Sequence, residues 1–115
     1  MPPTLADRVR HILEAIEDIE RALAEKSLES YANDRMLGAA IERLLEIVCE
    51  ASRQIPADAK SSEPNIDWQR MIDFGNRIRH AYHRIDAEIV WHVVINDLPP
   101  LKAFVVQIIR NSEST

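Results

Sequence analysis

Glycine is almost absent from this sequence, with two glycines in 115 residues, and the six prolines lie mostly at the edges of periodic segments. Hairpin turns and tight β connections depend on glycine and proline between short strands. A chain this poor in glycine is therefore predicted to be helical. Hydrophobic residues make up 46% and charged residues 29%, a mixture that excludes a disordered chain and can bury a core without disulfides.

Several other features are scarce, and each scarcity excludes a class of protein. Cys49 is the single cysteine, so no internal disulfide forms, and we expect a small buried thiol in a reducing cytoplasm. The N-terminal residues MPPTLADRVR contain no apolar signal core, and no apolar run approaches the roughly 18 residues of a membrane span, so we expect neither a signal peptide nor a span. The net charge of −5 argues against a general nucleic-acid binder, but not against a local basic patch.

Apolar residues recur at helical spacing in four segments. We expect helices over residues 4–26, with Thr4 and Asp7 as a capping box, over about 33–54, from Trp68 after the cap Asp67, and from 87 after the cap Asp86. Residues 27–34 and 56–66 are predicted to be connections, and the last helix is expected to kink or break near Pro99 and Pro100. The predicted fold is a single all-α domain over residues 1–115, an up-and-down antiparallel four-helix bundle.

The run Val93, Val94 and Ile95 cannot point entirely into one core. Part of this surface is therefore predicted to meet a second subunit, which makes a homodimer our expectation. His11 and His92 each lie among apolar residues, and we interpret both as packing or interface histidines.

The segment GNRIRHAYHRID, residues 75–86, contains the side chains that could carry out catalysis: three arginines, two histidines, an asparagine and a tyrosine. On a continuous helix, Asn76, His80 and His83 would form one polar row, because residues three and four apart share a face. A neutral imidazole can accept a proton from a ribose 2′-hydroxyl, and an arginine can bind the scissile phosphate through two hydrogen bonds. A ribonuclease that needs no metal requires these two groups, with the 2′-hydroxyl as its nucleophile.

Other interpretations of the same segment are open on the residues alone. Arginine and histidine near a helix C-terminus also stabilise the helix dipole without any catalytic role. Tyr82 could stack on an RNA base or be half-buried against a neighbouring helix. His80 and His83 are too few for a metal site, and no cysteine pair completes one, so we predict neither metal nor cofactor.

The order of several segments resembles a known family over nearly the whole chain. These segments are NDRMLGAAIERLLEIVCEASRQIP and IDWQRMIDFGNRIRHAYHRIDAEIVWHVVINDLPPLK, and the most telling pieces are Asn76, His80-x-Tyr82, Ile85-Asp86 and the stretch from Trp91 to Pro99. The chain resembles the HepT-like proteins (the DUF86 group) of the HEPN superfamily, which are small all-α proteins of bacteria and archaea.

The resemblance implies a dimeric four-helix bundle in which two motifs face one another across a cleft. It implies a ribonuclease toxin of a type VII toxin–antitoxin pair, whose partner is a minimal nucleotidyltransferase acting as antitoxin. In the family motif, His80 matches the acid/base histidine and Asn76 the polar residue that follows the family arginine. Tyr82 matches the tyrosine that the nucleotidyltransferase adenylylates to block the site.

The chain departs from the family pattern at one position, because the family arginine would fall at Gly75. Arg79 lies one helical turn later on nearly the same face, whereas Arg77 lies about 200° around the axis. We therefore predict His80, Asn76 and Arg79 as catalytic residues, with Arg77, Arg84 and His83 as contacts to RNA phosphates. The alternative is a catalytically degenerate module that binds RNA or nucleotide, or docks the partner. A structural dimer without either activity is the third hypothesis.

Overall fold

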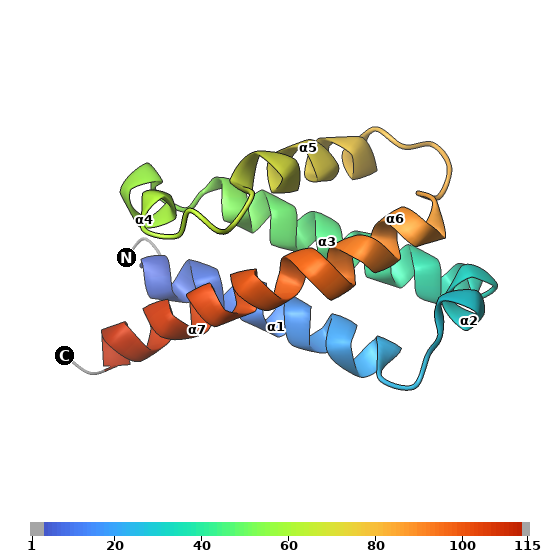
Figure 1. Cartoon of the computed structure of the whole chain (residues 1–115), viewed down its shortest axis with the longest axis horizontal. Coiled ribbons are helices and arrows are strands. Elements are labelled where there is room, and N and C mark those ends of the chain that lie inside the picture. The colour runs from blue at the N-terminus through green and yellow to red at the C-terminus, as the bar shows by residue number, and fades with distance from the viewer. Residues whose placement is uncertain (1–3, 114–115) are drawn as a thin grey trace.

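The computed structural model describes residues 4–113, and within this range every regular element is helical (Figure 1). The elements, in chain order, are α1 (Leu5–Leu23), α2 (Leu28–Ala32), α3 (Arg35–Arg53), α4 (Ala57–Ser61), α5 (Trp68–Arg79), α6 (Ala87–His92), η1 (Val93–Asp97) and α7 (Leu98–Glu113). The all-α prediction is thus confirmed.

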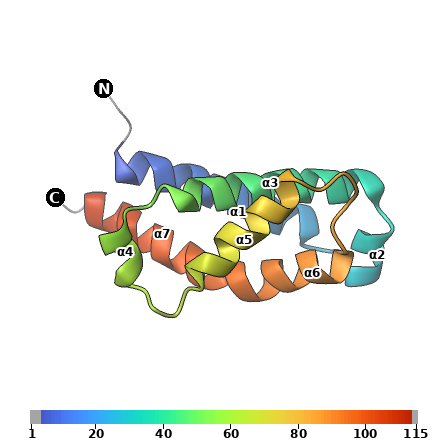
Figure 2. The ribbon, with the colours of Figure 1, turned by 90° about the horizontal axis from the view of Figure 1, so that it is seen from above.

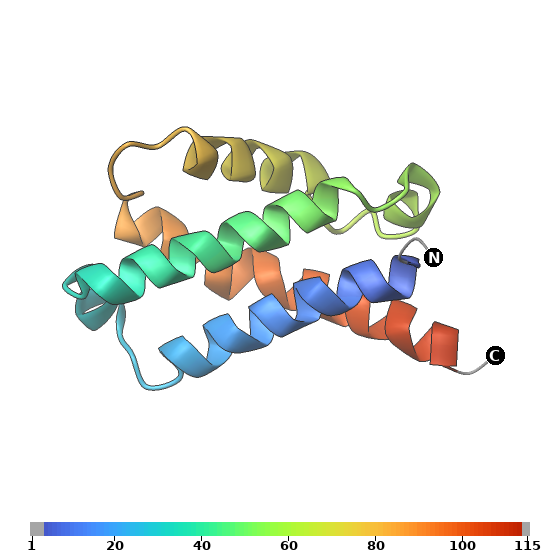
Figure 3. The ribbon, with the colours of Figure 1, turned by 180° about the vertical axis from the view of Figure 1, so that it is seen from behind.

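Four long helical segments alternate in direction along one axis. Helix α1 packs against α3 and α7, α3 packs against α5, and α6, η1 and α7 form the last segment (Figures 1 and 2). Seen from behind, α1 and α3 lie side by side in front of the last segment (Figure 3). The arrangement is the predicted up-and-down four-helix bundle, whereas the homodimer stays a prediction.

The core is built from the apolar faces that the helical spacing marks. The fully buried side chains come from α1, α2, α3, α6 and α7: Val9, Ile12, Ile16, Ile19, Tyr31, Ile41, Leu45, Val48, Cys49, Val90, Leu101 and Val105. Each such aliphatic side chain stabilises the fold by roughly 1.5–3 kcal/mol relative to an exposed one. The core therefore fixes the relative positions of α1, α3 and the last helix.

Aspartate and threonine side chains begin the long helices, as predicted. The Thr4 hydroxyl accepts a hydrogen bond from the Asp7 N–H at 3.1 Å, while the Asp7 carboxylate accepts from the Thr4 N–H at 2.9 Å. These bonds with Thr4 lower the pKa of the Asp7 carboxyl below its ordinary value. Asp67 accepts from the Arg70 N–H at 2.9 Å and Asp86 from the Glu88 N–H at 2.8 Å, which starts α5 and α6.

Of the kink or break that we expected near the prolines, the structure excludes the break. Residues Ala87–Glu113 form one continuous helix, and the five residues before Leu98 adopt the wider π-helical turn. Pro99 and Pro100 have no N–H, and a proline ring in an α-helix collides with the carbonyl four residues earlier. The Leu98 N–H donates instead to the Val93 carbonyl, so the widened turn makes room for the rings.

Two short helices occupy segments that we predicted to be connections. In α2, the paired side chains of Ser27 and Ser30 cap the first turn, and buried Tyr31 packs against Trp91 with ring centroids 5.9 Å apart. Helix α4 contacts Trp68, whose indole N–H donates a hydrogen bond to the Lys60 carbonyl at 3.2 Å. Both segments thereby contribute partners to the bundle.

The continuous last helix also qualifies the expectation that the sequence has no segment of membrane-spanning length. An 18-residue window within Ala87–Glu113 has a mean hydropathy of 1.3, which is sufficient for a span by length and composition alone. In the bundle, α6 packs against α2 and α7 against α1, so part of this apolar surface has protein partners, and 33% of the window is buried. Ile95 stays 56% exposed.

Candidate active site

The segment with the predicted site residues changes from helix to loop at His80. Helix α5 ends at Arg79, and His80 is its C-terminal cap, with its N–H donating to the Asn76 carbonyl at 3.2 Å. Residues 81–86 have no regular structure. The expected polar row of Asn76, His80 and His83 on one helix face is therefore wrong, because His83 lies beyond the end of the helix.

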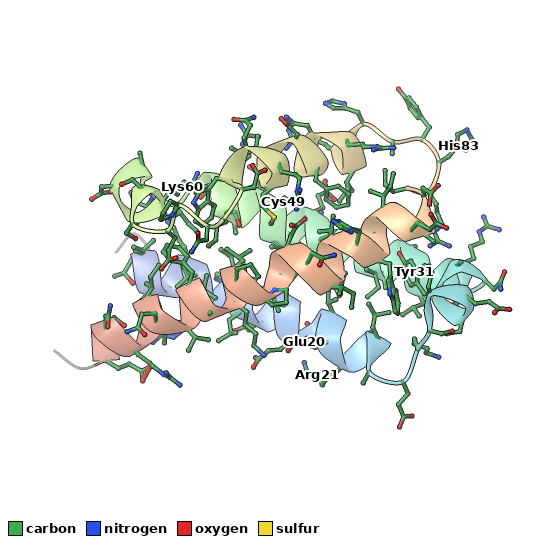
Figure 4. All side chains as sticks on the ribbon, in the orientation of Figure 1. Glu20, Arg21, Tyr31, Cys49, Lys60 and His83 are labelled. Carbon is green, nitrogen blue, oxygen red and sulfur yellow. The ribbon has the colours of Figure 1, made fainter. Side chains whose placement is uncertain are left out.

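The α5–α6 loop (residues 80–86) presents its polar side chains to solvent. His80 and His83 are exposed, and Tyr82 is 99% exposed, which excludes the half-buried tyrosine of the alternative interpretation. Figure 4 shows His83 pointing away from the bundle at the outer side of this loop. Asn76, in the last turns of α5, is also exposed. The loop thus offers two imidazoles and a phenol without any covering element in the described chain.

The far end of the loop is fixed to α3 by one carboxylate. Glu42 accepts hydrogen bonds from the Arg84 Nε and from the Ile85 N–H, both at 3.3 Å. The Arg84 guanidinium lies over the Tyr31 ring, 5.4 Å from its centroid. We call Tyr31, Gly38, Glu42, Arg84 and Ile85 the Glu42 cluster.

Gly38 provides the space for the arginine of this cluster. A Cβ built on Gly38 would lie 1.9 Å from the Arg84 guanidinium carbon, so any larger residue would displace that side chain. The space beside Gly38 is thus filled by a side chain from the loop. The Tyr31 hydroxyl and the Arg84 Nη2 are buried and form no hydrogen bond among the described residues, and burial raises the pKa of Tyr31.

The cluster changes the interpretation of Arg84, which we predicted to contact RNA phosphates. Its side chain is 30% exposed and is paired with Glu42, so it would have to leave this partner to bind a phosphate. No local pattern pointed to Glu42, because its partners lie 42 and 43 residues away in the chain. In this structure, Arg84 and Glu42 position the loop.

The two arginines at the end of α5 point to opposite sides of the helix. Arg79 pairs with Glu50 of α3 at 3.2 Å and borders a groove of about 510 Å³ between α1 and α3. Arg77 borders a second cavity, of about 420 Å³, between α5 and the α6–η1 segment. The two side chains thus border different hollows, as two positions about 200° apart on a helix should, and Arg79 is the arginine next to His80 on the α3 side.

Gly75 lies against α3, where it allows close helix packing. A Cβ added to Gly75 would lie 2.7 Å from the Cβ of Cys49, closer than two such atoms can approach. Cys49 is buried and unpaired, as predicted, and burial raises the pKa of its thiol to about 12. The position of the family arginine therefore faces the interface between α5 and α3 in this chain.

His11 and His92 are exposed, which excludes a packing role in the described chain, while their interface role stays a prediction. His11 is exposed on α1 beside the groove that Arg79 borders, and exposed His92 pairs with the Asn96 side chain at 3.0 Å. Within residues 4–113, no three His, Cys, Asp or Glu side chains are grouped so that they could hold a metal ion. The chemistry available at the loop is therefore that of imidazole, guanidinium, amide and phenol groups.

Comparison of the sequence with known proteins shows which family this chain is similar to. A family model described as ribonuclease HepT-like matches residues 12–108. A protein of Thermococcus cleftensis named "Probable ribonuclease HepT" is 38% identical over 84% of this chain and 87% of its own length. A candidate RNase of Methanocaldococcus jannaschii is 34% identical over 79% of this chain and 84% of its own length. No solved structure matches the chain.

Proposed function

Because the chain belongs to the ribonuclease HepT-like family, we propose that it cleaves RNA at the α5–α6 loop. The observation that supports this assignment most directly is the exposure of His80 beside Asn76, at the point where α5 ends. A catalytic imidazole must reach a ribose hydroxyl within hydrogen-bonding distance, and no described element covers this one.

In the proposed reaction, the neutral imidazole of His80 accepts the proton of a ribose 2′-hydroxyl. The 2′ oxygen then attacks the adjacent phosphorus, and the bond from phosphorus to the 5′ oxygen breaks. An imidazolium returns a proton to the departing 5′ oxygen, which leaves a 2′,3′-cyclic phosphate and a 5′-hydroxyl. Arg79 stabilises the phosphate charge and Asn76 orients the phosphate or the imidazole. No metal or other cofactor enters this scheme.

Three further contacts belong to the same proposal. His83 and Arg77 bind neighbouring phosphates, and Arg84 does so only if it exchanges Glu42 for the phosphate. We also propose that two chains pair so that both His80 side chains line one cleft. The apolar side chain of Ile95, 56% exposed, and the half-buried Trp91 beside it support an apolar interface on α6 and η1.

Metal-free cleavage of RNA by the purified protein in EDTA tests the enzymatic proposal. Loss of a general acid or base lowers a rate by roughly 10²- to 10⁴-fold, so His80→Ala should reduce cleavage by this factor. Arg21→Gln is the control, because Arg21 is an exposed α1 residue that is paired with Asp18 and lies outside every proposed contact. Products without a cyclic phosphate end, or equal activity of the His80→Ala protein, would exclude this mechanism.

We further propose that the protein is the toxin of a type VII toxin–antitoxin pair in the cytoplasm. A minimal nucleotidyltransferase would adenylylate Tyr82, whose 99% exposure supports access to a second enzyme. Expression of the chain should arrest growth, and coexpression of the nucleotidyltransferase should relieve the arrest. Tyr82→Phe should retain cleavage but lose this relief. Relief that is equal in both proteins would exclude modification of Tyr82.

A catalytically degenerate binding module is the second candidate, and the close packing at Gly75 favours it. Without an arginine at that position, the arginine adjacent to His80 in the chain is Arg79, which is already paired with Glu50. Such a module would bind RNA or nucleotide, or dock the nucleotidyltransferase, without cutting. RNA binding without cleavage, unchanged in the His80→Ala protein, would identify it.

A further inference from the structure

Two hollows flank α5, and their charges differ. The cavity between α5 and the α6–η1 segment has three carboxylates, from Asp73, Glu88 and Asp97, against two arginines. The groove between α1 and α3, which we call the Arg8 groove, has three arginines against two glutamates and also includes His11. A polyanion is therefore attracted more strongly by the second hollow than by the first.

The cations of the Arg8 groove come from three helices. Arg8 lies on α1, Arg43 on α3 and Arg79 at the end of α5. Arg43 pairs with Glu46 at 3.0 Å, and Arg79 pairs with Glu50 at 3.2 Å. The Arg8 guanidinium forms no hydrogen bond or ion pair with any side chain of residues 4–113. The surplus charge of the groove is thus the charge of Arg8.

The surface between these cations is apolar. Ile47 and Ala51 line the groove and are only partly buried against the core. Its volume of about 510 Å³ lies in the usual range for small-molecule sites, roughly 300–1,000 Å³. An apolar floor between cations suits a nucleotide, because the base covers apolar surface while the phosphate contacts the rim.

The groove is continuous with the candidate active site through one residue. Arg79 borders the groove and precedes His80 in the chain. We propose that the Arg8 groove binds the part of a single-stranded RNA that adjoins the bond to be cut, with Arg8 and Arg43 on its phosphates. This inference rests on the proposed function for the identity of the ligand, but not for any catalytic step.

Binding of a fluorescein-labelled 12-nucleotide single-stranded RNA, followed by anisotropy over a series of KCl concentrations, tests the groove. The His80→Ala protein is used as the background, so that cleavage does not interfere. Each lost phosphate contact lowers the slope of log affinity against log salt by about 0.7 for a single strand. We expect Arg8→Gln and Arg43→Gln each to weaken binding about three- to tenfold near 100 mM salt and to reduce the slope by this amount.

Two further variants complete the binding experiment, one that should strengthen binding and one that should leave it unchanged. Glu46→Gln removes a competing carboxylate and releases Arg43, so it should strengthen binding. Arg21→Gln is the matched control, because Arg21 is an exposed α1 arginine paired with Asp18 and does not line the groove. Circular dichroism melting of every variant checks that the fold is unchanged.

Several results would overturn the proposal. The groove is excluded if Arg8→Gln behaves like Arg21→Gln, or if Glu46→Gln weakens binding. Competition by poly-glutamate as strong as that of unlabelled RNA would indicate a surface for acidic proteins. Displacement by AMP at the same concentration as RNA would indicate a site for free nucleotides.

The outcome is separable from that of the ribonuclease proposal. Wild-type protein that binds RNA through Arg8 but does not cut it supports the groove and excludes the enzyme. Cleavage that depends on His80, together with RNA binding that is unchanged in Arg8→Gln, supports the ribonuclease proposal and excludes RNA binding in the Arg8 groove.

Discussion

The contact between Gly75 and Cys49 predicts that α5 and α3 tolerate no added atom at this point. In Gly75→Ala, the new Cβ would lie 2.7 Å from the Cys49 Cβ. Cys49 is in the interior of α3, so its Cβ is fixed by the helix backbone and cannot rotate away. Relief requires a shift of one helix relative to the other.

Two opposing effects set the magnitude of the change. Alanine is favoured over glycine in a helix interior by about 0.8–1.0 kcal/mol, which would stabilise the variant. Overpacking of a close-packed interior costs about 1–3 kcal/mol. We therefore expect Gly75→Ala to lower the free energy of unfolding by roughly 0–2 kcal/mol, instead of raising it by about 1 kcal/mol.

A double-mutant cycle isolates the contact from the helix propensity. Cys49→Gly removes the opposing Cβ, whereas Cys49→Ala keeps it and removes only the sulfur. Urea unfolding followed by circular dichroism should show a favourable coupling of about 1–3 kcal/mol between Gly75→Ala and Cys49→Gly. The same cycle with Cys49→Ala should show little coupling, because the two Cβ atoms still collide.

The reasoning fails if Gly75→Ala raises stability by the full propensity difference. It also fails if the Cys49→Gly and Cys49→Ala cycles give equal coupling energies. Either result would mean that the helices can separate at this point without cost.

Three other perturbations test separate parts of the structure. Gly38→Ala should displace the Arg84 guanidinium, so the Ile85 amide should exchange with deuterium faster while the global stability stays unchanged. NMR of amide exchange measures this rate, and an unchanged rate would contradict the role of the Glu42 cluster in holding the loop. The folded-state pKa of Cys49, about 12, lies above its unfolded value, so stability should fall as pH rises from about 9 towards 12, by about 1.4 kcal/mol per unit. Urea unfolding at pH 8 and 10 should show that Cys49→Ala lacks this part of the decline, and parallel curves would refute it. Thr4→Ala should cost about 1 kcal/mol in the same assay through loss of the α1 cap, and no change would show that the cap is dispensable.

The sequence predicted the elements whose causes are local. The apolar spacing of α1 and the caps Thr4, Asp67 and Asp86 involve residues two to four positions apart, and the structure confirms them. The bundle follows from four such helices with short connections. The π-helical turn before Pro99 was not predicted, because a single turn of five residues is too short to show a period of its own.

The end of α5 had no local signal. No glycine or proline lies between Asn76 and Asp86, so the pattern favoured a helix through His83. The contacts that fix the chain in a different path come from Glu42 on α3, through Arg84 and Ile85. Tertiary contacts thus override a weak local preference, and they decide where the candidate catalytic side chains lie.

The packing at Gly75 also bears on how the two candidate functions can be separated. An arginine placed at this position begins with the same Cβ, 2.7 Å from that of Cys49, so Gly75→Arg alone would disturb the α3–α5 contact before its guanidinium reached any phosphate. A failure of that variant to cleave RNA would therefore report on packing. In the pair Gly75→Arg and Cys49→Gly, the obstruction is removed, and a gain in cleavage would be due to the guanidinium. Absence of a gain in this folded pair would leave Arg79 as the arginine beside His80, and the Arg79→Gln protein would then show whether a catalytic arginine is present.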